Sequence, residues 1–147
     1  MKTEITIPAD ADCLRSTRSR LHSRCVVCNP AHPVGLGQDF QLQSDGSVES
    51  TFTGREVFEG YPGLLHGGVT AALLDGAMTN CLFARGIGAL TAELKVRYRE
   101  PVVVAGEVTT RAWLVETYDR LHFMRAELRQ DGRVKATAQG KFITNHE

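Results

Sequence analysis

The chain has 147 residues, of which 42% are hydrophobic and 23% are charged, and these proportions are ordinary for a soluble globular domain. This length is enough for one domain with a substantial core. The formal net charge is +0, so the overall charge does not favour binding to nucleic acid or to a membrane surface. Because no apolar run approaches a membrane span and no signal-peptide pattern opens the chain, we expect a cytoplasmic protein.

The N-terminal quarter of the sequence is polar and then loop-like. Four arginines are spaced along a short helix that we expect to begin near Asp10: Arg15, Arg18, Arg20 and Arg24. Prolines and glycines punctuate residues 24–37 and predict a loop there. We therefore expect residues 1–37 to form a helix and an entry loop that precede the main part of a single globular domain, residues 38–147.

The chain has four cysteines, Cys13, Cys25, Cys28 and Cys81. Without an export signal we expect reduced thiols or metal ligands before disulfides. Cys25 and Cys28 form a Cys-x-x-Cys motif, which is half of a zinc site. No second such motif exists, so the other ligands would have to come from Cys13, His22, His32 or a partner chain. We expect these thiols to pack the loop without a metal, and zinc is the alternative.

The middle of the sequence alternates between strand and helix signals. Phe40 and Leu42 alternate with polar residues, Asp45 and Gly46 fit a tight turn, and residues 48–52 return as a second strand. Residues 67–84 are the only long helix candidate, with apolar residues at helical spacing. Small residues are frequent in this segment, so another backbone can approach it closely.

Four further strands are expected after the helix. Residues 92–99 alternate most clearly, with Leu94 and Val96 on one face and Lys95, Arg97 and Arg99 on the other. Residues 106–116, 121–129 and 134–143 follow, separated by tight-turn signals. A hairpin, a long helix and a four-strand meander predict an α+β domain in which the sheet covers the helix.

The segment around His66, Gly67 and Gly68 is the most informative motif in the chain. Two glycines at a loop-to-helix junction leave backbone N–H groups at the positive end of a helix, where a polarised oxygen is well held. Asp75 follows in an apolar helical run, where burial would raise its pKa toward useful basicity. Backbone N–H groups that can polarise a carbonyl, together with a carboxylate, suggest acyl chemistry. In this interpretation Gly67 N–H is the oxyanion donor, and Asp75 is the base or, alternatively, the nucleophile.

The spacing of Gly67 and Asp75 predicts a shared site. Eight residues of helix rise about 12 Å, which is too far for one carbonyl and its attacking water. Two antiparallel helices across a two-fold axis bring Gly67 of one subunit to Asp75 of the other. We therefore expect at least a homodimer, with a homotetramer also open.

Other catalytic arrangements have weaker support. His66 precedes the helix, so we expect its ring to fix the junction by hydrogen bonding to backbone, with proton transfer as the alternative. No Gly-x-Ser-x-Gly elbow supports a serine hydrolase. Cys81 lies within the helix and fits a small buried residue better than a nucleophile.

The sequence from about Gly35 onward resembles the HGG-type hotdog-fold thioesterases, a family that includes the phenylacetic-acid-pathway enzyme and acyl-CoA thioesterases. The resemblance rests on His66-Gly67-Gly68 and on the position of Asp75. It implies a hotdog fold, in which a five- to six-stranded antiparallel sheet wraps one long helix, and hydrolysis of acyl-CoA. By the same resemblance, Thr91 matches a Ser or Thr that orients the attacking water. The family often has Asn or Gln where this chain has Gly60.

We therefore predict an acyl-CoA thioesterase whose only small-molecule partner is the acyl-CoA substrate and which needs no cofactor. The residues predicted to contact the substrate are Gly68, Met78, Arg97 and Arg99, the two arginines by meeting the phosphates of coenzyme A. A solvated sheet face is the alternative for the arginines. The alternatives for the protein are a non-catalytic acyl-CoA binder or sensor and a hotdog dehydratase. The acyl group is not identified by the sequence.

Overall fold

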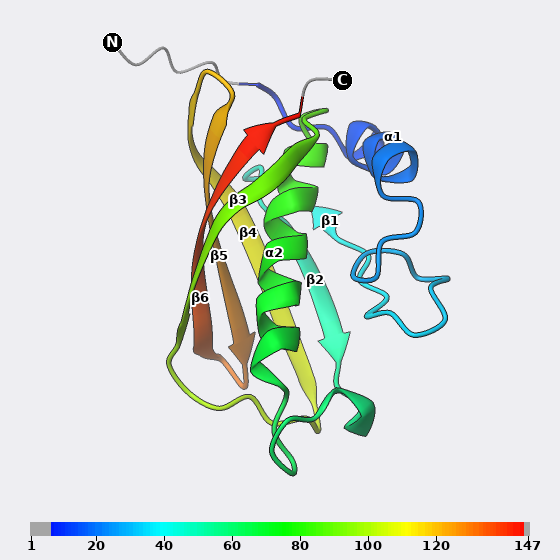
Figure 1. Ribbon diagram of the computed structural model, residues 1–147, viewed down its shortest axis with the longest axis vertical. Helices are drawn as coiled ribbons and strands as arrows, with labels where there is room; N and C mark the ends of the chain where they lie inside the picture. Colours follow the sequence, from blue (N-terminus) through cyan, green and yellow to red (C-terminus); the bar gives the residue numbers. More distant parts are fainter. Residues whose placement is uncertain (1–6, 146–147) are drawn as a thin grey trace.

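A curved antiparallel sheet wraps around one long helix in the computed structural model, which describes residues 7–145 (Figure 1). The described residues form, in chain order, α1 (Ala11–Leu21), β1 (Gln41–Leu42), β2 (Val48–Thr53), the 3-10 helix η1 (Glu56–Phe58), α2 (Gly67–Phe83), β3 (Ala89–Tyr98), β4 (Glu107–Tyr118), β5 (Leu121–Gln130) and β6 (Arg133–Thr144). Apart from η1, which carries no strong sequence signal, the sequence predicts all of these elements, with ends that differ by at most three residues.

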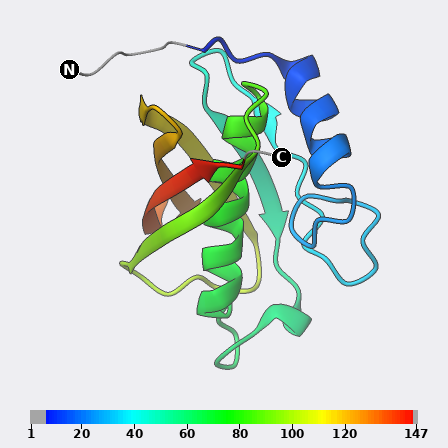
Figure 2. The same cartoon turned by 45° about the horizontal axis from the view of Figure 1, so that its top comes forward.

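The helix α2 forms the centre of the core. Leu73, Leu74, Ala77 and Met78 are fully buried, and the turned view shows the sheet curling around this helix (Figure 2). A Cβ atom on Gly140 of β6 would lie 3.0 Å from the Met78 sulfur, so the glycine lets helix and sheet approach closely. The predicted helix is confirmed, and apolar burial stabilises it.

The strand order differs from the expected meander. The sheet runs β1-β2-β4-β5-β6-β3, so β3 pairs with β6 rather than with β4, which follows it in the chain. The expectation of four consecutively paired strands is therefore wrong. The chain between β3 and β4 therefore crosses from the β6 side of the sheet to a position between β2 and β5. Among the four strands after α2, only β4, β5 and β6 form a meander.

The strand β3 is an edge strand of this sheet, and β6 is its one neighbour among residues 7–145. Leu94 and Val96 pack against the core, whereas Lys95 and Arg97 are exposed. The alternation predicted for this strand is confirmed. The register shifts between Thr91 and Glu93, and such a bulge changes the direction in which nearby side chains point.

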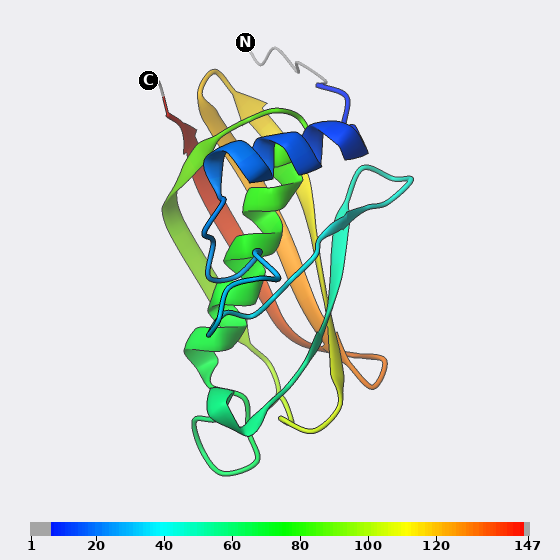
Figure 3. The same cartoon turned by 90° about the vertical axis from the view of Figure 1, so that its right-hand side faces the viewer.

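The N-terminal helix packs against α2 on the side that the sheet leaves open. Asp10 caps α1 by accepting a 2.8 Å hydrogen bond from the backbone N–H of Asp12, and Leu14 is only 2% exposed. Figure 3 shows α1 crossing one end of α2, with the following loop lying over the middle of α2. The predicted short helix near Asp10 is confirmed.

The loop after α1 approaches α2 closely at one glycine. A Cβ atom on Gly76 would lie 2.5 Å from Cγ1 of Val27, which is closer than real contacts allow. Backbone hydrogen bonds from Leu36 to Val26 and from Gln38 to Val27, both 2.8 Å, hold the loop in this position. The loop therefore covers the face of α2 that carries Asp75, the residue next to Gly76.

The sheet and central helix together form the expected hotdog fold, with six strands in the sheet. Across residues 7–145, none of the helices has both the length and the apolar character needed to span a bilayer.

Candidate active site

The junction before α2 is held by His66. Its Nδ1 accepts a 2.8 Å hydrogen bond from the backbone N–H of Gly68, and its carbonyl accepts bonds of 2.9 Å from Val69 and 3.2 Å from Thr70. A Cβ atom on Gly68 would lie 3.0 Å from Nδ1, so glycine lets the ring reach the backbone. The ring is thus a helix cap, as expected, and Gly68 N–H is already engaged rather than free for substrate.

Gly67 is the first residue of α2, so its N–H has no acceptor within the helix. Its carbonyl accepts a 2.7 Å hydrogen bond from the hydroxyl of Tyr98. The atoms nearest to a Cβ atom here would belong to Tyr98, at 3.5 Å or more, and the φ of Gly67 is not in the left-handed region. Packing among residues 7–145 therefore does not require glycine at this position, and the bare backbone is open to another molecule.

Gly60, where the family resemblance leads to an expectation of Asn or Gln, lies against His66. A Cβ atom on Gly60 would be 3.3 Å from the Cα atom of His66. The chain therefore has no carboxamide at this point, and the backbone N–H of Gly60 instead donates to the carbonyl of Leu64 at 3.1 Å.

Asp75 is half-buried on α2 and is held by Thr91 of β3. The Thr91 hydroxyl donates a 2.7 Å hydrogen bond to Oδ1 of Asp75. Burial raises the pKa of Asp75 above its ordinary value, and the Thr91 hydrogen bond opposes this effect without cancelling it. The carboxylate thus has one oriented oxygen and increased basicity, which suits a group that accepts a proton from water.

A cavity of about 450 Å³ opens beside Asp75. Its lining comes from α2 and from the end of α1 and the loop after it: Leu21, His22, Ser23, Arg24, Cys25, Val26, Val27, Asp75, Gly76, Thr79 and Asn80. Nothing local in the sequence indicates which face of α2 this loop covers, so its position at Asp75 is visible only in the structure.

Asn80 is the most unusual polar residue of this cavity. It is 0% exposed, and its Nδ2 donates a 2.8 Å hydrogen bond to the carbonyl of Gly76, one helical turn earlier. Its Oδ1 is buried without a hydrogen-bond partner among the described residues. A buried acceptor left in this state costs about 1–3 kcal/mol, so it marks a place where a bound molecule would be stabilised.

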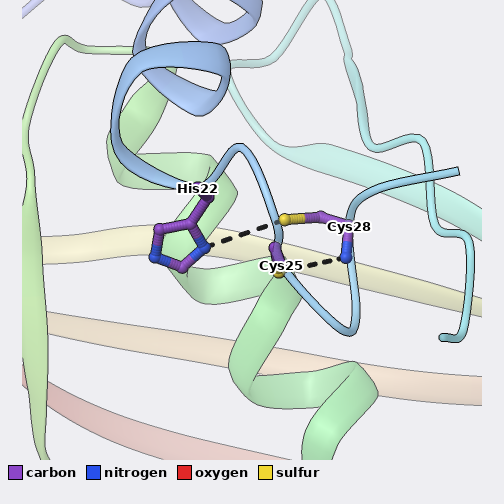
Figure 4. A group of neighbouring side chains, drawn as sticks. All are labelled: His22, Cys25 and Cys28. Atoms are coloured by element: carbon purple, nitrogen blue, oxygen red, sulfur yellow. Dashed lines mark hydrogen bonds between the residues drawn. The ribbon is translucent and has the colours of Figure 1, made fainter. Parts of the chain in front are cut away.

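His22, Cys25 and Cys28 form a cluster (Figure 4), and two of its members, His22 and Cys25, also line this cavity. The Cys28 sulfur lies 3.8 Å from Nδ1 of His22. The backbone N–H of Cys28 donates a 3.1 Å hydrogen bond to the Cys25 sulfur. Hydrogen bonding from Cys28 lowers the pKa of the Cys25 thiol to about 4. The same pairing, together with burial, raises the pKa of the Cys28 thiol. The pairing therefore favours a thiolate at Cys25 over a thiolate at Cys28.

The other predicted ligands for a zinc ion lie elsewhere. The sulfur of Cys13 faces the hydroxyl of Thr17 at 3.8 Å, and Nδ1 of His32 accepts a 3.2 Å hydrogen bond from Val34 N–H. Of the histidines and cysteines considered in the sequence analysis, the structure brings only His22 to the Cys-x-x-Cys motif.

The remaining residues predicted to contact substrate are not gathered at Asp75. Met78 is 0% exposed and packs in the core against Gly140. Arg97 and Arg99 line a separate hollow of about 180 Å³ with residues of β6. Because neighbouring side chains of a strand point to opposite faces, and Tyr98 reaches Gly67, both arginines lie on the sheet face that points away from α2.

Comparisons with known proteins agree with this architecture. A family model described as the thioesterase superfamily matches residues 62–137, a range that contains His66, Gly67, Asp75 and Thr91. Because this range is more than half of the chain, the chain belongs to the thioesterase superfamily.

Individual relatives carry related names. The chain is similar to the acyl-coenzyme A thioesterase THEM4 of Bos taurus, with 29% identity over 114 residues, covering 74% of this chain and 47% of the bovine protein. It is also similar to acyl-coenzyme A thioesterase 13 of Mus musculus, with 30% identity over 81 residues, covering 54% of this chain and 58% of the mouse protein. The chain thus spans about half the length of these curated relatives.

A solved structure supports the same family. The crystal structure of a protein from Ralstonia eutropha JMP134, described as a putative thioesterase and phenylacetic acid degradation-related protein, superposes with a TM-score of 0.72 at 26% identity, covering 90% of this chain and 98% of that one.

Proposed function

We propose that the protein hydrolyses acyl-CoA thioesters to a free acid and coenzyme A, with Asp75 as the general base. The observation that carries this proposal is the half-buried Asp75 carboxylate, which is held by Thr91 beside a cavity and has a raised pKa. Membership of the thioesterase superfamily and the names of the relatives support the reaction class.

The reaction needs two groups on opposite sides of the thioester. Asp75 removes a proton from water, and the oxygen attacks the carbonyl carbon while Gly67 N–H stabilises the oxyanion. The C–S bond then breaks as the oxyanion collapses, and the proton held by Asp75 passes to the departing sulfur. The products are a carboxylic acid and the thiol of coenzyme A, and no cofactor takes part.

The proposed site is shared between two copies of the chain. Gly67 and Asp75 are eight residues apart on α2, or about 12 Å along its axis. The edge strand β3 carries Thr91 and has a neighbour on only one side. Pairing of two β3 edges in an antiparallel dimer would continue the sheet and place the start of one α2 near Asp75 of the other. A homodimer, alone or within a homotetramer, is therefore part of the proposal.

His66 and Thr91 are positioning residues in this scheme. The His66 ring is occupied by its hydrogen bond to Gly68 and fixes the backbone that presents the Gly67 N–H. Thr91 orients one oxygen of Asp75, which leaves Oδ2 for water.

The proposal also includes a cytoplasmic location, which we expect from the sequence.

Substitution of Asp75 tests this function. In Asp75→Asn the shape is kept but the base is lost, so thiol release from acyl-CoA substrates should fall by about 10²–10⁴-fold, while binding of coenzyme A persists. The matched control is Asp131→Asn, because Asp131 is exposed in a turn with φ of 52°, a conformation that Asn tolerates.

Two results would contradict the proposal. Near-normal turnover in folded Asp75→Asn would remove Asp75 from the chemistry. Saturable binding of acyl-CoA without thiol release from any chain length would favour a binding or sensing protein instead.

A further inference from the structure

The cluster of His22, Cys25 and Cys28 lies outside the chemistry proposed above, and it has the composition of a metal site. Its three potential ligand atoms, one ring nitrogen and two sulfurs, all lie within 4.8 Å of one another. The ligands of a tetrahedral zinc ion lie roughly 3.5–3.8 Å apart when the Zn–N and Zn–S bonds are about 2.0 and 2.3 Å. The N···S distance at such an ion is about 3.5 Å, and the Cys28 sulfur and Nδ1 of His22 lie 3.8 Å apart, so a small approach of the two side chains is enough.

We propose that His22, Cys25 and Cys28 bind one Zn²⁺ ion, with the fourth coordination position open to the cavity beside Asp75. The ligands follow a His-x-x-Cys-x-x-Cys spacing from the end of α1 through the following loop. This proposal replaces the sequence-based expectation that the two thiols only pack the loop.

The local backbone favours a metal site at these residues. His22 ends α1, and the backbone N–H of Cys25 donates to the His22 carbonyl at 3.2 Å, so the chain turns directly from the first ligand to the second. The N–H of Cys28 donates to the Cys25 sulfur, and the N–H of Asn29 donates to the Cys25 carbonyl at 3.0 Å. This turn points both sulfurs toward one position and supports negative charge on the first.

The surroundings supply the outer contacts that metal ligands need. Cys28 is 1% exposed, and the Asn80 side chain lies within hydrogen-bonding reach of its sulfur. Hydrogen bonds of this kind orient ligands and tune the metal. Asn80 Oδ1 is a buried acceptor without a described partner in the same cavity. A water molecule on the open coordination position would be a donor there.

Zinc in this position would connect the end of α1 to the loop that covers Asp75. Both thiols would bind as thiolates and release their protons to solvent. With one neutral imidazole, two thiolates and Zn²⁺ the charges balance, so a site half enclosed by protein would carry no net charge. The ion would thereby stabilise the wall of the cavity, and the native state would gain stability through binding.

Metal analysis of the full-length protein tests the proposal. We expect one zinc per chain after purification under reducing conditions without chelator. After zinc is replaced, Co²⁺ should produce thiolate-to-cobalt absorption and the visible bands of a tetrahedral ion. Cys25→Ser, Cys28→Ser and the less disruptive His22→Gln should each weaken zinc affinity more than about 100-fold, beyond the 10–100-fold typical of an outer-shell loss.

Matched controls are available in the same chain. Cys13→Ser and His32→Gln change the same residue types outside the cluster, and they should keep full zinc content and the Co²⁺ spectrum. A chelator should lower the melting temperature of the wild type and of these controls, but not that of folded His22→Gln.

Three outcomes would overturn the proposal. The first is absence of saturable zinc or Co²⁺ binding in a folded protein with four free thiols. The second is zinc content that persists unchanged in the cluster variants. The third is a Cys25–Cys28 disulfide that remains under reducing conditions, because it would show a redox pair.

Discussion

At the scale of single residues, the two conflicting influences on Asp75 are the most informative feature. Burial raises the pKa of its carboxyl group, and the hydroxyl of Thr91 stabilises the charged form. Because burial is the larger influence, the carboxylate is a stronger base than an exposed aspartate. Thr91 therefore orients the carboxylate and limits how far burial raises its pKa.

We predict that Thr91→Val shifts the acid limb of the kcat/KM profile to higher pH. The base must be deprotonated to act, so activity rises as pH passes through its pKa. Removal of a donor to the charged form raises that pKa further. Thr91→Ser keeps the hydroxyl and should retain the wild-type limb. An unchanged profile in Thr91→Val, measured at constant metal content, would contradict this role.

At the scale of elements, one buried histidine connects the ends of three strands. His122 of β5 is 2% exposed, and its ring nitrogens lie 2.9 Å from the hydroxyl of Thr117 on β4 and 2.7 Å from that of Thr144 on β6. Burial lowers the pKa of His122. The folded state thus favours the neutral ring, which is bonded on both sides.

This lowered pKa predicts how stability depends on pH. As pH falls through the ordinary histidine pKa of about 6.5, the unfolded chain takes up a proton before the folded chain does. The His122 contribution is therefore present at neutral pH and lost on acidification. Urea unfolding from about pH 7.5 to about pH 5 should show a smaller decline for His122→Gln than for the wild type.

The same variant should be less stable at neutral pH, by about 0.5–1.5 kcal/mol per lost hydrogen bond, because the half-buried hydroxyl groups of Thr117 and Thr144 lose their partner. His32→Gln, which changes a histidine of the N-terminal loop, serves as the control and should follow the wild-type decline. Parallel curves for His122→Gln and the wild type would show that His122 does not cause the pH dependence.

At the scale of the whole molecule, the separation of Gly67 and Asp75 on one rigid helix makes the proposed site dependent on a second copy. This arrangement predicts complementation between two inactive variants. Asp75→Asn lacks the base, and Gly67→Pro lacks the N–H donor while proline remains compatible with the first turn of a helix. Each homodimer should be inactive.

Exchange of subunits between these variants should restore activity. A heterodimer keeps one site with both groups intact, and half of randomly exchanged dimers are heterodimers, so about a quarter of wild-type activity is expected. Tagged subunits would measure the exchange itself. Heterodimers that form without any recovery of activity would contradict the shared site.

Much of the architecture could be predicted from local patterns. The alternation of Leu94 and Val96 with basic residues indicates a strand, and the apolar run after Gly67 indicates a core helix, because period and burial are local properties of the sequence. The motif at His66 and the position of Asp75 likewise indicate a polarising helix start and a buried carboxylate. These features are determined by the sequence itself.

Other features depend on which distant segments meet. Pairing of β3 with β6 rather than β4, and placement of the Cys25–Cys28 loop over Asp75, involve residues far apart in the chain. No local period reports such contacts, since they are chosen by the free energy of packing the whole core. Gly76 illustrates the difference. The sequence shows that this residue is a glycine, but only its close approach to Val27 shows that the absence of a side chain makes room for the loop. The tertiary structure alone therefore decided that His22 and Cys25 line the cavity beside Asp75.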